Sequence, residues 1–441
     1  MNSYFITITI IAICCLFGNA YGDVVVGYSS AAKYVIKAGT DATPKVALAI
    51  QDAANSGSGP VIFEAGLYWI SSPLVLSTGV ELKGTSTTGT ILKLMNNVTS
   101  WVNDTTTVSG MIHIVGADNG RVSFMTLDGN RANQNTSDLV GKYGVYIQDS
   151  QGVSIWQCVI RNFGGYGVAL HETSMADSVH VDAVTIDYSN ITNNGWDGVV
   201  IDSYENVAIR FSTISGNRGH GVNMLDGSNN VVITNNTFVG NGYYFPADLG
   251  GSGVNMNLGS SVDASAVHIV TNVFDSNFYA GVSMTNVINA DVARNVIRNS
   301  EYCMTLSNTD SSNMTRNVCE NILSNANLVD SDSQSNNNNL FLMYPFVENN
   351  VTVNLAMPNA TIPTTTMPPP DAFPADTTDN SMTYAGSGGA GTGAGAGSST
   401  GGLNSSPVLL NISGVPNSSG SVRNMVGLTP IAIMLMYLLI V

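Results

Sequence analysis

One four-residue phrase recurs seven times between Tyr143 and Leu306. It opens with a small residue, glycine in six cases, and continues with an apolar, a variable and a second apolar residue. The copies are Gly144-Val-Tyr-Ile, Gly167-Val-Ala-Leu, Gly198-Val-Val-Ile, Gly221-Val-Asn-Met, Gly253-Val-Asn-Met, Gly281-Val-Ser-Met and Cys303-Met-Thr-Leu, at spacings of 23, 31, 23, 32, 28 and 22 residues. Such a period is typical of a solenoid, because one coil cannot bury its apolar face alone. The phrase therefore predicts an all-β chain that folds as a parallel β-helix.

Alternation along each strand predicts which residues face the core. We expect the second and fourth residues of the phrase to point inward, and the glycine, the third residue and the residue after the phrase to point outward. Equivalent residues of stacked coils lie about 4.8 Å apart and form columns. The buried column is predicted to be Val145, Val168, Val199, Val222, Val254 and Val282. The outward columns are Gln148, His171, Asp202, Leu225, Asn257 and Thr285 after the phrase, and Tyr143, Tyr166, Asp197, His220, Ser252 and Ala280 before the glycine.

Asparagines mark the turn that precedes most of the phrases. Asn tolerates the left-handed backbone conformation, and one Asn per coil at the same corner can form a hydrogen-bonded ladder. We expect a structural ladder from Asn162, Asn193 or Asn194, Asn217, Asn277 and Asn299.

A helix is predicted at the N-terminal end of the solenoid. Thr43 is expected to be the N-cap and Pro44 the first helical residue, followed by apolar residues at helical spacing up to Ala53. Such a helix would cap the open end of the stack, as terminal units of a solenoid must.

The two ends of the chain read as targeting and anchoring segments. Residues 1–22 have the layout of a signal peptide, and the β-helix domain is predicted over residues 23–353. Residues 354–420 are Pro/Thr-rich and then Gly/Ala/Ser-rich, which predicts a disordered stalk. Residues 421–441 resemble a glycolipid-anchor signal; the alternative, a transmembrane helix, needs about 20 apolar residues. Eleven Asn-x-Ser/Thr sequons fit a secreted glycoprotein on the extracellular face of the plasma membrane.

Three cysteines remain after removal of the signal peptide. An odd number argues against a disulfide scaffold. Cys303 and Cys319 are 16 residues apart and could bridge neighbouring coil segments, whereas Cys158 is expected to pack as a buried thiol.

The charge balance excludes nucleic acid as a partner. The chain has 15 Lys plus Arg against 31 Asp plus Glu, and an acidic surface repels phosphates. The basic residues from Arg121 to Arg218 lie on the coils that carry the candidate site. They either form a basic groove for an anionic polymer or are scattered solvated side chains. They are Arg121, Arg131, Lys142, Arg161, Arg210 and Arg218.

Tyrosine, histidine and carboxylate residues meet in the two outward columns over three or four coils, which is the composition of an acid–base site. Three motifs surround these columns: Thr126-Leu-Asp-Gly-Asn-Arg131, Gly165-Tyr-Gly-Val-Ala-Leu-His-Glu172 and Asn217-Arg-Gly-His-Gly-Val-Asn223. They resemble motifs in the catalytic module of the mannuronan 5-epimerases, right-handed parallel β-helices related to pectate lyases. The resemblance covers roughly residues 38–308.

The resemblance assigns roles to matching residues. Tyr166 and His171 match the proton-transfer pair of the family, His220 matches the histidine of the next coil, and Glu172 matches the family glutamate. The chain departs from the family at Ala169, where the family has its aspartate, and at Leu170, where it has proline. Gly219 stands at the arginine position, with Arg218 one residue earlier, and the supporting lysine has no aligned match. Lys142 lies nearby on the preceding coil.

The chemistry explains why these groups are needed together. Carbon 5 of a uronate becomes acidic only when its carboxylate is neutralised; a base then removes the proton, and an acid on the other face returns one. If the acid protonates the departing 4-oxygen instead, the polymer is cleaved, so an epimerase and a lyase share one site. The alternative is a non-catalytic glycan-binding or wall-associated protein. We expect the partner to be a uronate polysaccharide and the chain to be a monomer.

No cofactor is required by this chemistry. No Cys/His cluster has the spacing of a zinc site. Calcium is an option through exposed carboxylates such as Asp197 and Asp202, although no calcium-binding nonapeptide repeat is present.

The missing family aspartate has a candidate replacement. Column stacking places Asp202 beside His171 on the next coil, about 4.8 Å away if the strands are in register. We therefore predict a catalytic set of Tyr166, His171, Asp202 and Arg218, with Lys142, Glu172, Asp197, His220 and Asn223 contacting the substrate.

Overall fold

The computed structural model describes residues 23–342, apart from 58, 99–108, 135–141, 174–183, 226, 244–250, 259–265, 310, 324–327, 331–333 and 338–339. The predicted signal peptide, stalk and anchor signal lie outside these residues. Among the described residues, no helix is long and apolar enough to cross a membrane.

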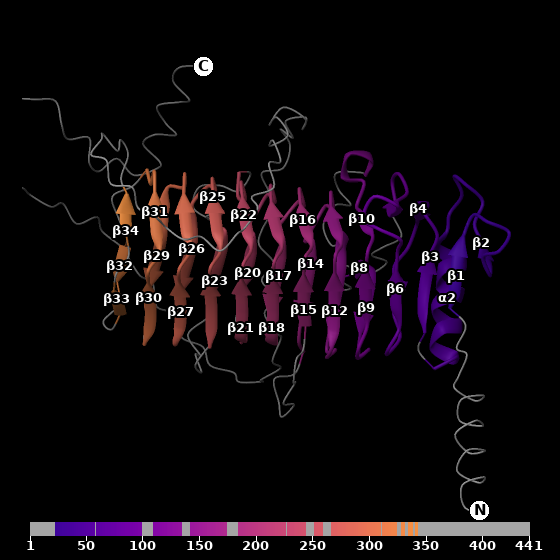
Figure 1. Cartoon of the computed structure of the whole chain (residues 1–441), viewed down its shortest axis with the longest axis horizontal. Helices are drawn as coiled ribbons and strands as arrows, with labels where there is room; N and C mark the ends of the chain where they lie inside the picture. Colours follow the sequence, from indigo (N-terminus) through magenta and orange to yellow (C-terminus); the bar gives the residue numbers. More distant parts are fainter. Residues whose placement is uncertain are drawn as a thin grey trace, which may run out of the picture. The chain divides into compact units, whose positions relative to one another are not determined.

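Three parallel sheets, here called A, B and C, run side by side along the solenoid (Figure 1). Sheet A contains β2 (Tyr34–Val35), β1 (Val24–Gly27), β3 (Pro60–Phe63), β6 (Glu81–Lys83), β9 (Arg121–Ser123), β12 (Val153–Trp156), β15 (Val184–Asp187), β18 (Glu205–Arg210), β21 (Asn229–Thr234), β24 (Val267–Val270), β27 (Ala290–Ala293), β30 (Ser312–Thr315) and β33 (Gln334–Asn337). Sheet B contains β4 (Gly66–Ile70), β7 (Thr90–Leu94), β10 (Thr126–Asp128), β13 (Val159–Arg161), β16 (Asn190–Thr192), β19 (Thr213–Ser215), β22 (Thr237–Val239), β25 (Val273–Asp275), β28 (Val296–Arg298), β31 (Val318–Glu320) and β34 (Leu340–Leu342). Sheet C contains β5 (Leu74–Val75), β8 (Ser109–Val115), β11 (Lys142–Gln148), β14 (Val168–His171), β17 (Val199–Asp202), β20 (Val222–Met224), β23 (Val254–Asn257), β26 (Ala280–Thr285), β29 (Tyr302–Ser307) and β32 (Leu328–Asp330).

The seven phrases lie on seven consecutive strands of sheet C, from β11 to β29. Val145 pairs with Val168, Val168 with Val199, and the same register continues to Val282. All six valines of the predicted column have 0% exposure. The parallel β-helix and its buried column are therefore confirmed.

The predicted orientation of the glycines is wrong. Gly198 precedes β17 rather than lying within it, so strand alternation does not apply to it. A Cβ at Gly198 would lie 2.6 Å from the Gly221 carbonyl oxygen and 2.6 Å from Ile214 Cγ2 of sheet B. The position faces the core, and only a residue without a side chain lets sheet C approach sheet B this closely.

We expect Gly198→Ala to destabilise the domain by about 1–3 kcal/mol, because its methyl group must displace a backbone carbonyl and a core isoleucine. Gly59→Ala is the matched control, since a Cβ there meets nothing within 4 Å. Urea unfolding of both variants measures the difference. Equal midpoints would contradict the inward orientation.

Two asparagine ladders line the turns of the solenoid. The predicted asparagines Asn194, Asn217 and Asn277 form a ladder together with Asn241, which was not predicted; each Nδ2 donates to the next Oδ1 at 2.9–3.1 Å. Asn162, Asn193 and Asn299 are not rungs of it; they lie in the same turn, one residue before the rung position, with φ values of 56–57°. A second ladder, which was not predicted, joins Asn236, Asn272, Asn295 and Asn317. Each ladder satisfies buried polar groups that would otherwise cost free energy.

The N-terminal helix α2 (Thr43–Asn55) packs against β1, β2, β3 and β5 at one end of the stack (Figure 1). The helix is confirmed, but Thr43 is its first residue rather than its cap. Ala42 occupies the cap position, and Asp41 Oδ1 accepts the Thr43 N–H at 2.9 Å.

The cysteines follow the predicted pattern. Cys303 and Cys319 form a disulfide, and Cys158 is a buried free thiol. The bridge joins β29 of sheet C to β31 of sheet B.

Candidate acid–base site on the outer face of sheet C

The predicted site residues lie on the outer face of sheet C, along two rows. One row consists of residues just before the strands, such as Tyr166, Asp197 and His220. The other consists of residues that end them, such as His171 and Asp202. Ala169 and Val200, which pair with each other in register, lie between the rows.

His171 and Asp202 form the central contact. The two residues pair directly across β14 and β17, as predicted. His171 Nδ1 lies 2.9 Å from Asp202 Oδ2, and both side chains remain partly exposed. The hydrogen bond to Asp202 raises the pKa of His171 above its ordinary value of 6.5. With the Nδ1 proton donated to Asp202, the other ring nitrogen, Nε2, is the basic atom available to a ligand.

A phenol and an amide border this pair on the preceding coil. The Tyr146 hydroxyl donates to Gln148 Oε1 at 2.9 Å, and Gln148 is the register partner of His171. Burial raises the pKa of Tyr146 to about 12, and the carboxylates of Asp149 and Asp202 add to the increase. Gln148 lies in the predicted outward column, but no role was predicted for Gln148 or Tyr146.

Aromatic rings cover the opposite row. The Tyr166 ring lies 4.8 Å from the ring of Tyr143 and 4.9 Å from that of Trp196. Trp196 was missed, although it directly precedes Asp197 in the repeat and so could have been found from its spacing. The three rings provide an apolar surface beside the acid–base pair.

A buried polar chain continues this row beyond the aromatic rings. Asp197 is 3% exposed; its carboxylate accepts the His220 backbone N–H at 2.6 Å and Asn223 Nδ2 at 3.0 Å. Asn223 Oδ1 in turn accepts Asn255 Nδ2 at 2.9 Å. Three predicted substrate-contacting residues are thus brought together, and two of them are buried.

His220 is held in one neutral form. Its Nδ1 accepts the Ser252 backbone N–H at 3.1 Å, so the ring proton resides on Nε2. Burial lowers the pKa of His220 to about 3. The two histidines therefore differ: His171 offers a basic Nε2, and His220 offers an Nε2–H donor.

Asp197 should make the stability of the domain depend on pH. Burial raises its pKa from 3.8 to about 7, which corresponds to at most about 4 kcal/mol. Between pH 3.8 and about 7 the folded chain keeps this proton, whereas the unfolded chain loses it. The contribution of Asp197 to the free energy of unfolding therefore falls as pH rises through this window. We expect Asp197→Asn to gain stability relative to the natural chain over this window. Urea unfolding of both chains at pH 4, 5, 6, 7 and 8 measures it, and parallel curves would contradict it.

The position at which the family has its aspartate belongs to a buried apolar cluster in this chain. Ala169 is 3% exposed and Val200 4%, and both pack with Tyr143 and Tyr146. An Ala169→Asp substitution would place a carboxylate in this apolar cluster, where it loses its hydration.

Three other predicted site residues flank the two rows in the sequence: Lys142 precedes Tyr143, Glu172 follows His171, and Arg218 is two residues before His220. Lys142 is 2% exposed, and its amine donates to the Val98 carbonyl and to Gln134 Oε1. Glu172 is 8% exposed and follows His171 into the turn. Arg218 lies one coil beyond Asp197, and its backbone N–H donates to the Asn194 carbonyl at 3.0 Å. Their predicted roles stay predictions.

The basic residues do not form a single groove. Arg121 and Arg210 belong to sheet A, and Arg161 to sheet B. Arg210 pairs with Asp187 at 2.7 Å and Arg161 with Asp128 at 3.1 Å. These basic residues are scattered side chains, the alternative to a groove, because successive strands of one coil belong to different sheets.

The exposure predicted for the possible calcium ligands is wrong for Asp197, which is 3% exposed, whereas Asp202 is partly exposed. The Asp197 oxygens face two N–H donors, and Asp202 Oδ2 faces His171. Within the described part of the chain, no three His, Cys, Asp or Glu residues are grouped for metal binding.

The sequence is similar to known carbohydrate-active β-helices. Mannuronan C5-epimerase AlgE2 of Azotobacter vinelandii is 30% identical over 234 residues, which cover 50% of this chain and 22% of that protein. Alginate lyase 7 of the same organism is 27% identical over 205 residues, which cover 44% of this chain and 22% of that protein. The chain thus spans about a fifth of the length of these relatives.

Solved structures share the architecture. The A-module of mannuronan C-5 epimerase AlgE4 of Azotobacter vinelandii has a TM-score of 0.52 at 19% identity, covering 69% of this chain and 93% of that one. A polygalacturonase from Erwinia carotovora has a TM-score of 0.54 at 14% identity, covering 74% and 96%. These likenesses concern the fold.

The family model described as "Right handed beta helix region" matches residues 110–297 and 174–341, which together exceed half of the chain. With the three parallel sheets and their register, this match shows that the chain belongs to the right-handed β-helix family.

Proposed function

We propose that this protein modifies a uronate polysaccharide by acid–base chemistry at carbon 5, as a mannuronan 5-epimerase does. The observation that carries the proposal is the contact of 2.9 Å between His171 Nδ1 and Asp202 Oδ2. It supplies an oriented imidazole on the face where the sequence resembles the epimerases, and it does so without the family aspartate. The similarity to epimerases and to an alginate lyase supports the same class of substrate.

In the proposed reaction, His171 Nε2 removes the proton from carbon 5 of the sugar. The imidazolium that forms is stabilised by Asp202, as a carboxylate stabilises a charged histidine elsewhere. Tyr166 returns a proton to the opposite face of carbon 5, so one proton is taken and one is given. Cleavage follows if the proton instead reaches the 4-oxygen: the bond from carbon 4 to that oxygen breaks, and a double bond forms between carbons 4 and 5.

The sugar carboxylate must be neutralised before carbon 5 becomes acidic. We assign this role to Arg218 together with His220. The fixed tautomer of His220 supports its part, because an Nε2–H that does not titrate near neutral pH can donate to a carboxylate at every working pH.

A second candidate function is glycan binding without turnover. The burial of Ala169 favours glycan binding without turnover, because a residue of a buried apolar cluster stands where the family has its aspartate. In this case the rings of Tyr143, Tyr166 and Trp196 bind the sugar, and His171 is a surface residue.

Incubation of the protein with polymannuronate in deuterated water separates the candidates. Deuterium at carbon 5 with an intact polymer indicates epimerisation, and ultraviolet absorbance from an unsaturated sugar end indicates elimination. If neither signal appears but the protein is retained on immobilised polymer, the protein only binds the glycan. If neither signal appears and the protein is not retained, both functions are excluded for this substrate.

We also propose that the protein acts outside the cell, held on the plasma membrane by a glycolipid attached near Ser418 or Ser419. Release from intact cells by a phosphatidylinositol-specific phospholipase supports this location. Retention of an epitope placed after Val441 counts against it.

A further inference from the structure

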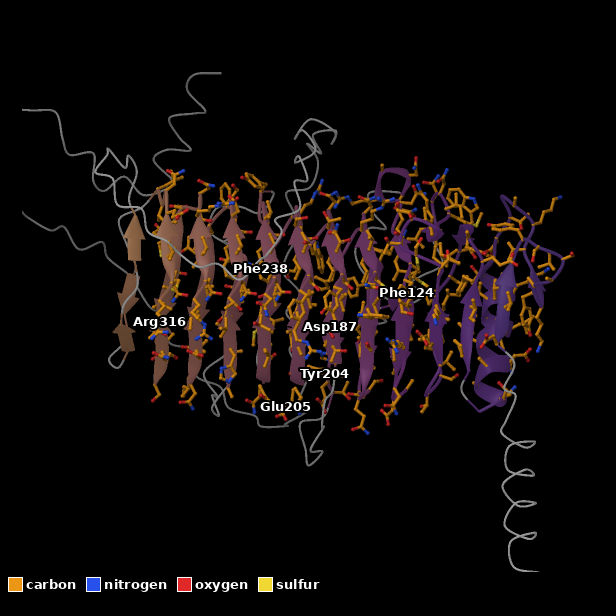
Figure 2. All side chains as sticks on the ribbon, in the orientation of Figure 1. Phe124, Asp187, Tyr204, Glu205, Phe238 and Arg316 are labelled. Atoms are coloured by element: carbon orange, nitrogen blue, oxygen red, sulfur yellow. A yellow bond between two sulfur atoms is a disulfide. The ribbon has the colours of Figure 1, made fainter. Side chains whose placement is uncertain are left out.

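One corner of the solenoid carries a continuous row of residues in the left-handed backbone conformation, five of which are exposed and three half-buried. The chain turns there from sheet A to sheet B, once per coil. The residues of this row, here called the corner ridge, are Phe124, Gln157, Tyr188, Phe211, Asn235, Thr271, Arg294 and Arg316, with φ values between 49° and 58°. Figure 2 labels its first and last members, Phe124 and Arg316, which lie far apart along the stack. This corner is the one that does not border sheet C, so the ridge is separate from the acid–base site.

The ridge residues are an unfavourable choice for their backbone. A left-handed conformation suits Gly and Asn, and it is an outlier for bulky residues. Only Asn235 among the eight is an asparagine. Tyr188 and Phe211, both at φ 52°, each store on the order of 1–3 kcal/mol of strain. Strain of this kind persists only where the surrounding structure enforces it, and it clusters at functional sites.

Five ridge residues are exposed: Tyr188, Phe211, Asn235, Arg294 and Arg316. Tyr188 is 54% exposed and Phe211 49%, and their rings stack at 5.0 Å with an angle of 9° between planes. Arg294 and Arg316 are exposed and have no ion-pair partner among the described residues. Asp187, the acidic residue beside Tyr188, is already neutralised by Arg210 at 2.7 Å. Two free arginines are therefore displayed by a chain with a net charge of −16.

The backbone behind the ridge is rigid. Each ridge residue from Asn235 onward is followed by a rung of the second ladder: Asn236, Asn272, Asn295 and Asn317. Ser212 follows Phe211 and donates its N–H to Asn236 Oδ1 at 2.9 Å, which extends the ladder to the aromatic pair. The ridge is thus held in place before any ligand binds, which lowers the entropic cost of binding.

We propose that the corner ridge is a second, non-catalytic binding site for an anionic polysaccharide chain that runs along the solenoid axis. The aromatic pair offers apolar surface to the C–H faces of pyranose rings, and the guanidinium groups bind sugar carboxylates in bidentate fashion. Three coils separate Phe211 from Arg294, or roughly 14 Å at the strand spacing. A single sugar does not reach across this distance, whereas a polymer does.

The site would complement the proposed function without depending on it. A polymer held on the ridge keeps other parts of the same chain near sheet C, which raises their effective concentration at the acid–base site. Short oligosaccharides would gain nothing, because they cannot engage both sites at once.

The test measures binding of polymannuronate to the full chain by affinity electrophoresis, in a His171→Ala background that removes turnover. Arg294→Gln with Arg316→Gln, and separately Tyr188→Asn with Phe211→Asn, are expected to weaken binding at least about ten-fold. The arginine variant should also reduce the salt dependence of binding. Thr271→Asn, on the same ridge and in the same conformation, is the matched control and should bind as before.

The asparagine variants separate binding from folding. Asn accepts the left-handed conformation, so Tyr188→Asn with Phe211→Asn should unfold at the same temperature or higher while binding less. Unchanged binding by both double variants would overturn the proposal. The arginine variant keeps it testable even if the aromatic variant fails to fold, because both arginines are exposed.

Two further results bear on the proposal. Asn235 begins a sequon, so binding is measured on protein from a host that does not N-glycosylate and on protein from a host that does. Loss of binding in the glycosylated protein would overturn the proposal for the glycosylated chain.

The ridge variants with His171 intact should turn over short oligosaccharides as the natural chain does. If the natural chain shows no turnover but the ridge still binds polymer, the proposed catalytic function is wrong and the proposed binding site on the ridge is supported.

Discussion

His171→Ala is expected to lower turnover on a uronate polymer by about 10²–10⁴-fold, the range that general acid–base catalysis contributes. Asp202→Asn removes a hydrogen bond to a charged group, which is worth about 1.5–3 kcal/mol, and should lower turnover by about ten- to a hundred-fold. Neither change should unfold the chain, because both side chains are partly exposed at the outer face of sheet C.

The pH dependence distinguishes positioning from a structural role. If His171 is the base, activity falls as pH drops through its raised pKa. Asp202→Asn removes the main cause of that increase, so the acidic limb of the pH–rate profile should move to lower pH while the maximum falls. A lower maximum with an unmoved limb would contradict the assignment.

Sheet A provides a matched control for these variants. His268 Nδ1 lies 3.7 Å from Asp291 Oδ2 on the adjacent strand, which is a histidine–aspartate pair away from the site. His268→Ala and Asp291→Asn should leave turnover and its pH profile unchanged. An equal loss in both pairs would indicate a general effect on the solenoid.

Val199→Asp is expected to unfold the β-helix. Val199 has 0% exposure and lies between Val168 and Val222 in the buried column. An unpaired carboxylate there costs several kcal/mol, a large part of the roughly 5–15 kcal/mol by which a domain is stable.

Loss of the β-sheet circular dichroism signal measures this effect. Val75→Asp is the control, because Val75 belongs to the same sheet and is 58% exposed; its effect should stay within about 0.5 kcal/mol. A folded Val199→Asp protein would contradict the packing of the column.

The repeat by itself determined the architecture. Seven phrases with an apolar second and fourth residue can bury those residues only by stacking, so the parallel strands, the valine column and the pairing of His171 with Asp202 all follow from spacing. An asparagine ladder follows as well, because asparagines recur at one corner of the coils, but the spacing left Asn193 and Asn194 as alternatives and only the structure selected Asn194.

Only the tertiary structure decided which residues around the site are exposed and which are buried. Alternation applies within a strand, but Gly198 and Asp197 precede β17, so their directions depend on the turn and on sheet B beneath them. Ala169, Asp197 and Asn223 are buried by neighbours on other coils, which no local pattern reveals. The corner ridge is a further case: its residues share no side-chain type, and they form one row because a backbone conformation, not a sequence motif, recurs there.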